Sequence, residues 1–251
     1  MGVQIINPFL GAGGGGGGDP DLALWLAAWK ETGYSDGDRI TTLVDWSGNG
    51  RDFTAPNSGA RPRFDANVLN SQPGFWFGGN SDQNYANRDV FFSGSQSVEA
   101  MFVIKKPASE NGNGAWKFDG GNWASHFTFG GTIYDAFCSQ DRDAYTPTYS
   151  ELTAGVIYQV SIANGTNNHK VWQNGNNNKI TRTSTVNHSH GTTPKVQVGA
   201  SSDQNNGSSQ TNWFHGHILE LKIWSKVLSN SERNTELAAL NSRYGISVTN
   251  F

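Results

Sequence analysis

The chain has 251 residues, a formal net charge of -3 at pH 7, and no basic run of the kind that binds nucleic acid. No apolar run approaches the roughly 20 residues that span a bilayer, so membrane insertion is not expected. The single cysteine, Cys138, excludes an intrachain disulfide, while 31 glycines and only 16% charged residues are typical of an all-β protein with many turns.

Residues 1–20 are predicted to form an arm separate from the folded domain, which takes up residues 21–251. Residues 1–10 are rich in apolar side chains, and residues 11–18 hold seven glycines in eight positions, which makes a flexible tether. The alternative is a tail without fixed structure. We expect the arm to dock onto a larger assembly, and the residues expected to make that contact are Ile5, Ile6, Phe9 and Leu10.

The domain then shows a series of strand and turn signals. Residues 22–29 (LALWLAAW) fit either a helix or a buried strand, and residues 45–50 (DWSGNG) form a turn cluster that we interpret as a structural turn anchored by Trp46. Asn174-Gly175 predicts a hairpin. We expect 116–118 and 127–129 to pair, and the strands expected between the turns cover residues 75–77, 98–104, 116–118, 127–129, 156–162, 170–173 and 196–198.

The C-terminal part carries the clearest signals. Residues 217–224 alternate in polarity, which predicts a strand with His217 and every second residue after it on one face. Ser229 precedes Glu232 by three residues, the spacing of a capping box at a helix start. Apolar residues then recur at helical spacing before Gly245, where the helix is expected to end. A lone amphipathic helix after many strands must cover a sheet.

These segments resemble concanavalin A-like lectin/glucanase domains of the laminin-G-like type, which occur in bacterial and viral proteins. The resemblance covers roughly residues 21–246 and rests on LALWLAAW, VDWSGNGRDFTA, ARPRFDANVLNSQPGFWFGG and WFHGHILELKIWSKVLSNSERNTELAALNSRYGI. It implies that residues 22–29 form a buried strand. The expected fold is all-β, a two-sheet antiparallel β-sandwich (a concanavalin A-like jelly roll) with one C-terminal helix. Such sandwiches serve lectins, hydrolases and structural proteins alike.

The sequence shows no catalytic machinery. A retaining glycosidase needs two carboxylates about 5 Å apart, and the E-x-D-x-E pattern that carries them in related glucanases does not occur. The strand carboxylates Glu99 and Glu220 stand alone, so we expect them to face solvent. The patterns G-x-S-x-G, H-E-x-x-H and GKS/GKT are also absent, and Cys138 is expected to be a buried small residue. We therefore expect a protein that is not an enzyme.

Metal-binding signals are incomplete. Four of the six histidines fall in two H-x-H pairs, His188/His190 and His215/His217. Alternate residues of a strand share a face, so each pair offers two imidazoles, which do not close a site. Two aspartate pairs have a spacing suited to chelation, Asp36/Asp38 and Asp141/Asp143. Because neither completes the D-x-D-x-D-G pattern, we expect no cofactor, with calcium as the alternative. The weak metal candidates are Asp36, Asp38, His188 and His190.

Sugar recognition needs an exposed aromatic ring for the apolar face of a pyranose and polar side chains for its hydroxyl groups. Two loops have this composition. Their candidate glycan-binding residues are Asp119, Asn122, Trp123, His126, Asp203 and Trp213. The alternative is that both tryptophans belong to the core or a sheet edge.

The favoured hypothesis is a non-enzymatic bacteriophage virion protein, a capsid decoration, head fibre or tail-associated adhesin made in the host cytoplasm. The N-terminus lacks the basic start and continuous apolar stretch of a secretion signal, and a phage reaches the outside by lysis. Its expected partners are other virion proteins, copies of itself and cell-surface glycans. The alternative is a free carbohydrate-binding module or a glycoside-hydrolase-associated lectin domain of a bacterial secreted protein.

Overall fold

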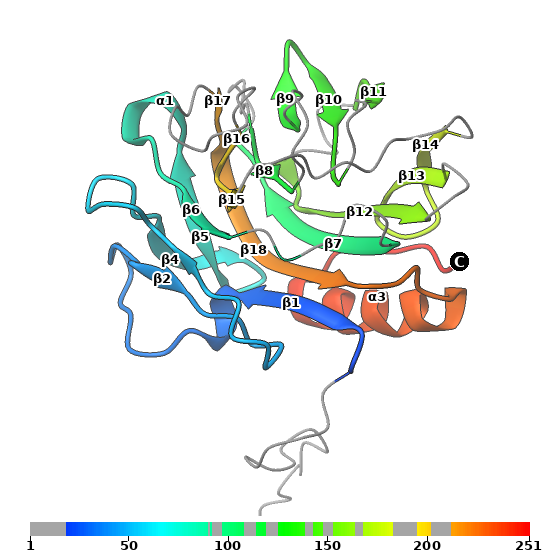
Figure 1. Cartoon of the computed structure of the whole chain (residues 1–251), viewed down its shortest axis with the longest axis horizontal. Coiled ribbons are helices and arrows are strands. Elements are labelled where there is room, and N and C mark those ends of the chain that lie inside the picture. Colours follow the sequence, from blue (N-terminus) through cyan, green and yellow to red (C-terminus); the bar gives the residue numbers. More distant parts are fainter. Residues whose placement is uncertain are drawn as a thin grey trace, which may run out of the picture.

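Two antiparallel sheets face each other in the computed structural model, and a helix covers the outer side of the larger one (Figure 1). The structure describes residues 19–89, 91, 97–107, 114–118, 125–138, 143–147, 153–163, 168–182, 195–201 and 212–251. The larger sheet has the order β14 (Asn178–Arg182), β13 (Asn168–Gln173), β12 (Val156–Ala163), β7 (Val98–Lys105), β18 (His215–Trp224), β5 (Gln72–Gly78) and β4 (Arg63–Leu69), with β1 (Leu22–Ala27) also paired to β18.

The second sheet is shorter and lies across the core. Its order is β2 (Thr42–Leu43), β3 (Phe53–Thr54), β6 (Ala86–Asp89), β15 (Lys195–Val198) and β8 (Trp116–Lys117). Two small sheets complete the described strands: β11 (Asp143–Tyr145), β10 (Thr132–Asp135) and β9 (His126–Phe129), and the pair β16 (Ala200–Ser201) and β17 (Asn212–Trp213). The short helical turns are η1 (Ala28–Lys30) and α1 (Gly79–Asp82).

The core between the sheets is built from alternating apolar residues and aromatic rings. Strand β7 contributes Val98, Ala100, Phe102 and Ile104. The Phe102 ring stacks on that of Trp116 from β8, with centroids 4.0 Å apart. Each buried aromatic side chain removes about 150–250 Å² from water, so rings of this kind dominate the stability of the sandwich. The predicted strands at 98–104 and 156–162 are confirmed.

Helix α3 (Asn230–Tyr244) begins and ends as the sequence predicts. Ser229 Oγ accepts a hydrogen bond from the backbone N–H of Glu232, whose carboxylate accepts one from Ser229 N–H, which completes the capping box. Gly245 follows with φ 66°, a left-handed conformation that favours glycine. The buried residues Leu237 and Tyr244 pack on the outer face of the larger sheet. The lone helix therefore covers a sheet, as expected.

The predicted alternation along 217–224 is wrong at one point. The register of β18 shifts between Ile218 and Glu220, and a bulge of this kind reverses the side on which later residues lie. Ile218 and Leu221 both pack in the core between the sheets, whereas Leu219 packs with α3 on the outer side. The apolar face of the strand therefore changes along its length.

The prediction that Glu99 and Glu220 face solvent is also wrong, because α3 and η1 cover both carboxylates. Glu99 bonds to Arg233 of α3, and Glu220 accepts hydrogen bonds from the indole N–H groups of Trp25 and Trp29. In α3, the Tyr244 hydroxyl and Arg243 Nη1 also donate to Glu220, each at 2.8 Å. Buried carboxylates require such donors.

Most other local predictions are confirmed. Residues 22–27 form strand β1, and Asn174 and Gly175, both with positive φ, turn the chain from β13 to β14. The expected pairing of 116–118 with 127–129 is wrong, because β8 pairs with β15 and β9 with β10. Trp116 instead forms an isolated bridge with Ser125. No helix in the described part of the chain is long and apolar enough to cross a membrane.

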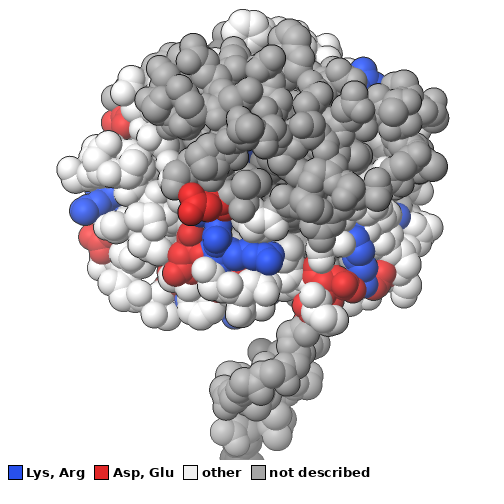
Figure 2. Space-filling view, in the orientation of Figure 1, with Lys and Arg blue, Asp and Glu red and all other residues white. Residues whose placement is uncertain are grey.

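Among the described residues on the face shown in Figure 2, charged side chains form small clusters that contain both signs of charge. Ion pairs of this mixed kind join Lys226 to Asp21 and Glu232, at 2.9 and 2.7 Å. Long-range attraction requires a surface dominated by one sign of charge. The described part of this face therefore shows no extended patch of one sign that would attract a polyanion.

Candidate functional site

Most of the site residues expected from the sequence lie outside the described part of the chain. These are Ile5, Ile6, Phe9, Leu10, Asp119, Asn122, Trp123, His188, His190 and Asp203. His126 is buried on β9 with its ring against Phe129 and Tyr134. Trp213 is half-buried on β17 and packs against the Tyr85 ring at 5.6 Å. The expected sugar-binding loops therefore stay predictions.

The described metal candidates bind protein groups. Asp36 accepts a hydrogen bond from Ala66 N–H and Asp38 accepts one from Ser35 N–H, at 2.8 and 2.7 Å. Within the described ranges, no set of three or more His, Cys, Asp or Glu residues is placed to hold a metal ion. The Asp38 bond orders the loop itself, and the Asp36 bond joins the loop to β4. Calcium binding is left as a prediction.

The pair His215/His217 lies on one face of β18, against the Trp76 ring of β5. The imidazole centroids are 4.9 and 4.7 Å from the Trp76 ring. His217 Nε2 is 2.8 Å from Asp65 Oδ2, yet burial lowers the pKa of His217 below its usual value. Both imidazole rings pack against the Trp76 ring, so the H-x-H spacing of this pair places two histidine rings on one indole.

Exposed aromatic rings are the more informative feature, because such side chains are normally buried. Among the described residues, the exposed aromatic side chains are Trp46 (37%) and Phe129 (55%). Phe129 stands at a hairpin tip between β9 and β10. Trp46 instead belongs to a surface with two further tryptophans and a polar hollow, which provides both kinds of contact that a sugar needs.

The loop 45–52 holds this surface in place through one buried carboxylate. Asp45 accepts hydrogen bonds from the backbone N–H groups of Trp25, Ser47 and Arg51, at 3.0, 2.9 and 2.8 Å. Several backbone N–H donors on one carboxylate are a strong arrangement, because hydrogen bonds to an ionised acceptor are about twice as strong as neutral ones. The carboxylate therefore fastens the loop along β1.

Three tryptophans surround one lysine at this loop. The Lys30 ammonium lies 4.4 Å from the Trp25 ring, 5.0 Å from Trp29 and 5.0 Å from Trp46. Glu220 fixes Trp25 and Trp29 from the sheet side through their indole N–H groups, at 2.8 and 3.1 Å. The rings are thus held before any ligand arrives, which lowers the entropy lost on binding.

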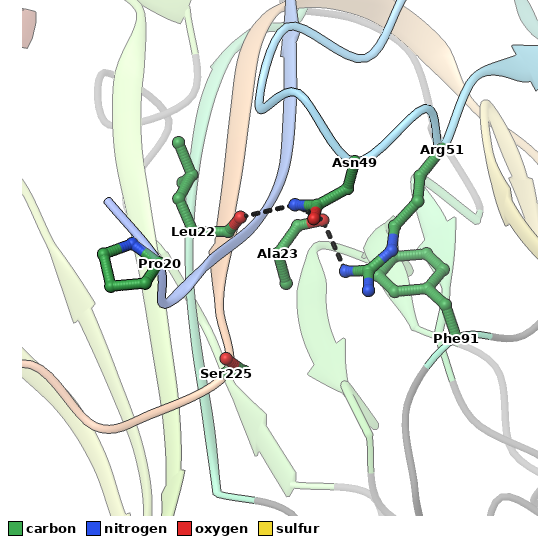
Figure 3. Close-up of a pocket in the computed structure, with 7 residues that line it drawn as sticks. All are labelled: Pro20, Leu22, Ala23, Asn49, Arg51, Phe91 and Ser225. Carbon is green, nitrogen blue, oxygen red and sulfur yellow. Dashed lines mark hydrogen bonds between the residues drawn. The ribbon is translucent and has the colours of Figure 1, made fainter. Parts of the chain in front are cut away.

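A polar hollow of about 160 Å³ adjoins the same loop (Figure 3). Asn49 Nδ2 donates to Leu22 O at 2.8 Å, and Arg51 Nη1 donates to Ala23 O at 2.6 Å. The hollow is lined by Pro20, Leu22, Ala23, Asn49, Arg51, Phe91 and Ser225. Its volume is below the roughly 300–1,000 Å³ of pockets for drug-sized ligands. It therefore suits a single sugar unit or one substituent.

The tryptophan surface and the hollow lie along the same strand, β1, and share the loop 45–52, which holds Trp46 and supplies Asn49 and Arg51 to the hollow. Trp46 N–H donates to Trp25 O, whereas Asn49 reaches Leu22 O, three residues earlier. With a rise of about 3.3 Å per residue, their two points of attachment on β1 lie roughly 10 Å apart. We call this set of residues the loop site, and its members are Trp25, Trp29, Lys30, Trp46, Asn49 and Arg51.

The buried strand carboxylates do not form a hydrolytic pair. Glu220 lies opposite Val103, four residues from Glu99 along β7, which places their Cα atoms more than about 13 Å apart at the usual rise. Their carboxylates bind side chains far apart on α3, Arg233 for Glu99 and Tyr244 for Glu220. Retaining glycosidases hold their carboxylates about 5–5.5 Å apart and inverting ones about 6.5–9.5 Å. Both Glu99 and Glu220 are also enclosed by protein donors. The loop site offers binding groups instead.

Comparisons with known proteins support the fold. No protein-family model and no curated protein matches the chain. The binding domain of botulinum neurotoxin D matches with TM-score 0.56 at 15% identity over 91% of this chain and 54% of that one. The binding domain of botulinum neurotoxin DC in complex with SialylT matches with TM-score 0.56 at 14% identity, over 88% of this chain and 51% of that one. This chain therefore spans about half the length of those toxin chains.

In a third similar structure, the match covers nearly the whole of the other chain. Domain 4 of an extracellular GH43 arabinanase from Geobacillus stearothermophilus, in complex with arabinotriose, matches with TM-score 0.53 at 16% identity, over 87% of this chain and 98% of that domain. The chain is thus an antiparallel β-sandwich with one C-terminal helix, similar to known binding domains. The finer assignment to concanavalin A-like domains has no matching family model and stays a prediction.

Proposed function

We propose that this chain is a carbohydrate-binding domain that holds a saccharide at the loop site. The observation that carries the proposal is the exposed Trp46 ring, fixed in an array of three tryptophans beside a polar hollow. Similar structures include an arabinanase domain in complex with arabinotriose and a toxin binding domain in complex with SialylT, which supports a role in binding.

The loop site offers the two kinds of contact in the required order. The apolar face of a sugar ring would pack on Trp46, since aromatic rings supply a large apolar area and present a polar edge. Asn49 and Arg51 would meet the hydroxyl groups of the next unit about 10 Å along β1. An extended oligosaccharide therefore fits better than a single sugar.

The substitution Trp46→Ala should weaken binding of a glycan found by array screening about 30-fold, or roughly 2 kcal/mol, as for a central aromatic contact. Isothermal titration calorimetry gives the ratio. The matched control is Phe129→Ala, which removes the other exposed ring and should change the affinity less than twofold.

A further comparison separates this site from the loops expected from the sequence. Trp123→Ala should leave the affinity unchanged if the loop site binds the glycan. A large loss with Trp123→Ala and none with Trp46→Ala would assign binding to residues 119–126, and an array without hits would reject carbohydrate binding.

The finer role, a virion protein docked by its N-terminal arm, is a second proposal. It is favoured by the apolar residues 1–10 on a glycine tether. The domain's described contacts begin at Asp19, whose carboxylate accepts a hydrogen bond from the Trp224 indole N–H at 3.1 Å. A chain lacking residues 1–18 keeps this contact.

Deleting residues 1–18 should shift the melting temperature by less than about 2 °C and leave glycan binding intact. Incorporation into particles should be lost, which quantitative blotting of purified virions measures. Unchanged incorporation would contradict docking by the arm and favour a free carbohydrate-binding module.

A further inference from the structure

We propose that Lys30 sets the charge specificity of the loop site. Its ammonium fills an aromatic cage that would otherwise accept the cationic group of a ligand, so saccharides with an amino group are rejected in favour of neutral or acidic ones. The inference rests on the proposed function and narrows its ligand class. Its basis is one ammonium group that contacts three tryptophan rings, which we call the tryptophan cage: Trp25, Trp29 and Trp46.

The distances are those of a cage that binds cations. A cation within about 6 Å of a ring centroid is attracted by the negative face of the ring, and cages of several rings recognise quaternary ammonium ligands. Lys30 Nζ lies 4.4 Å from the Trp25 centroid and 5.0 Å from each of the other two. The lysine of the chain therefore occupies the position that a ligand ammonium would take.

The walls of the tryptophan cage are held without Lys30. Glu220 accepts the indole N–H groups of Trp25 and Trp29, whose ring centroids lie 6.0 Å apart with an interplanar angle of 58°. The backbone N–H of Trp46 donates to Trp25 O at 2.8 Å. Removing the lysine side chain should therefore leave an open cage, because the contacts that position the rings remain.

A second cation of the chain contacts each of two cage rings. Lys222 Nζ lies 4.7 Å from the Trp25 centroid, and the guanidinium carbon of Arg243 lies 4.1 Å from the Trp29 centroid. Each of these rings therefore already attracts two positive charges. A ligand cation would have to displace one of them before it could bind.

The charges around Lys30 also oppose a further cation. The neighbouring carboxylates pair with other groups, Glu236 with Lys222 at 2.5 Å and Glu220 with Arg243 at 2.8 Å. Burial lowers the pKa of Lys30 and Arg243 lowers it further, while Glu220 raises it and Lys222 lowers it again. An added ammonium group would therefore meet repulsion at the cage.

The same geometry suits neutral and acidic sugars. Trp46 is 37% exposed, so its ring still offers an apolar area to a pyranose. Lys30 is half-buried, and an ammonium has three N–H donors and no acceptor. A hydroxyl or carboxylate oxygen beside Trp46 therefore meets a donor, whereas a ligand ammonium meets a like charge.

The first test compares methyl β-glucoside with methyl β-glucosaminide, in a mildly acidic buffer that keeps the amine protonated. The wild-type domain should bind the neutral sugar at least about tenfold more tightly, measured by NMR titration. Lys30→Met keeps a side chain of similar length without its charge and should reduce this preference to less than about threefold. Arg39→Met is the matched control, since Arg39 is exposed and pairs with Asp82, and it should leave the preference unchanged.

The second test needs no sugar and uses tetramethylammonium as the probe. Lys30→Ala empties the cage and should bind it with a Kd in roughly the millimolar range, because three ring contacts act together. The wild-type domain and Lys30→Met should bind it at least about tenfold more weakly, because their cage is filled. Shifts of the indole N–H resonances of Trp25, Trp29 and Trp46 measure binding, and the melting temperature checks folding. Lys30→Ser takes the place of Lys30→Ala if that variant does not fold.

Equal affinity of the wild-type domain for the two sugars would overturn this inference while leaving carbohydrate binding in place. If no sugar binds but tetramethylammonium binds Lys30→Ala and not the wild type, the lysine-filled cage stands and the proposed function fails. If tetramethylammonium shifts none of the three indole resonances in the folded variant, the cage is overturned whether or not sugars bind.

Discussion

Replacing Glu99 with alanine should lower the free energy of unfolding by about 3–5 kcal/mol, the range for breaking a buried ion pair by removing one partner. Glu99 and Arg233 form a bidentate pair, with Nε to Oε1 and Nη2 to Oε2 both at 2.8 Å. Leu228 N–H also donates to Glu99 Oε2 at 3.0 Å. The substitution would leave the arginine charge and this donor without their acceptor. Urea unfolding measures the change, provided that the m-value is unchanged.

The cost arises because Arg233 is largely shielded from water. Its guanidinium carbon lies 4.9 Å from the Trp172 ring and 5.1 Å from the Phe251 ring, and little of the side chain is exposed. Desolvation raises the pKa of Glu99 despite the pair, so the charged state is itself only partly compensated. A double variant, Glu99→Leu with Arg233→Met, should therefore recover most of the loss, since apolar replacements of buried pairs are often neutral.

Arg39→Ala provides the control for a surface ion pair. Arg39 and Asp82 lie 3.5 Å apart with side-chain exposures of 42% and 37%, and such pairs contribute about 0–1 kcal/mol. A loss for Glu99→Ala no larger than for Arg39→Ala would show that water reaches Arg233 and would contradict the burial argument.

Predictions from the sequence succeeded where the determining contacts are local. The capping box joins Ser229 to Glu232, and the stop at Gly245 depends on the conformation of one residue. The bulge in β18 could not be predicted in this way, because it arises where the strand changes its pairing from β5 to β1 while it pairs with β7 on its other side. Strand alternation shows where a strand lies and does not show its irregularities.

Buried carboxylates are the clearest failure of the sequence patterns. Glu99 and Glu220 occupy strand positions that usually face solvent, and their donors are far away in the sequence. Arg233 lies 134 residues from Glu99, and Trp25 lies 195 residues from Glu220. Only the packing of α3 and η1 on the sheet brings donor and acceptor together, so the sequence alone predicts the opposite exposure.

The loop site was partly visible in the sequence. The DWSGNG pattern predicts the turn around Trp46 but gives no information on its neighbours. Trp25 and Trp29, followed by Lys30, were a usable signal, because aromatic residues beside a lysine can form a cation–π cluster. Their grouping with Trp46 depends on the hydrogen bond from Trp46 N–H to Trp25 O, which joins two segments 21 residues apart.

A second large effect is expected from His169, a fully buried residue of β13 between two carboxylates. Its Nε2 lies 2.7 Å from Asp135 Oδ2 of β10, and its Nδ1 lies 2.5 Å from Asp143 Oδ2 of β11. Arg182 of β14 adds a second cation, 3.1 Å from Asp143. The imidazole fills the space between the carboxylates, so they form no open acid pair for catalysis. The cluster instead fastens the small sheet to the larger one.

The protonation of His169 should make stability depend on pH. Burial alone would lower its pKa, but the hydrogen bonds and charges of Asp135 and Asp143 outweigh burial and raise the pKa to about 9. Because the folded pKa exceeds the unfolded one, the stabilisation is complete below pH 6.5 and is lost as pH rises through 9. The difference corresponds to a decrease in unfolding free energy on the order of 3 kcal/mol.

Substituting His169→Asn should lower stability at pH 6 and remove most of its decrease between pH 6.5 and 9, as measured by urea unfolding at several pH values. His217→Asn is the matched control, since burial lowers the pKa of His217 and its contribution is therefore lost toward acid pH. An unchanged alkaline decrease in His169→Asn would show that another group causes it. Because burial without partners would have kept this imidazole neutral, the alkaline decrease directly reports the two carboxylates.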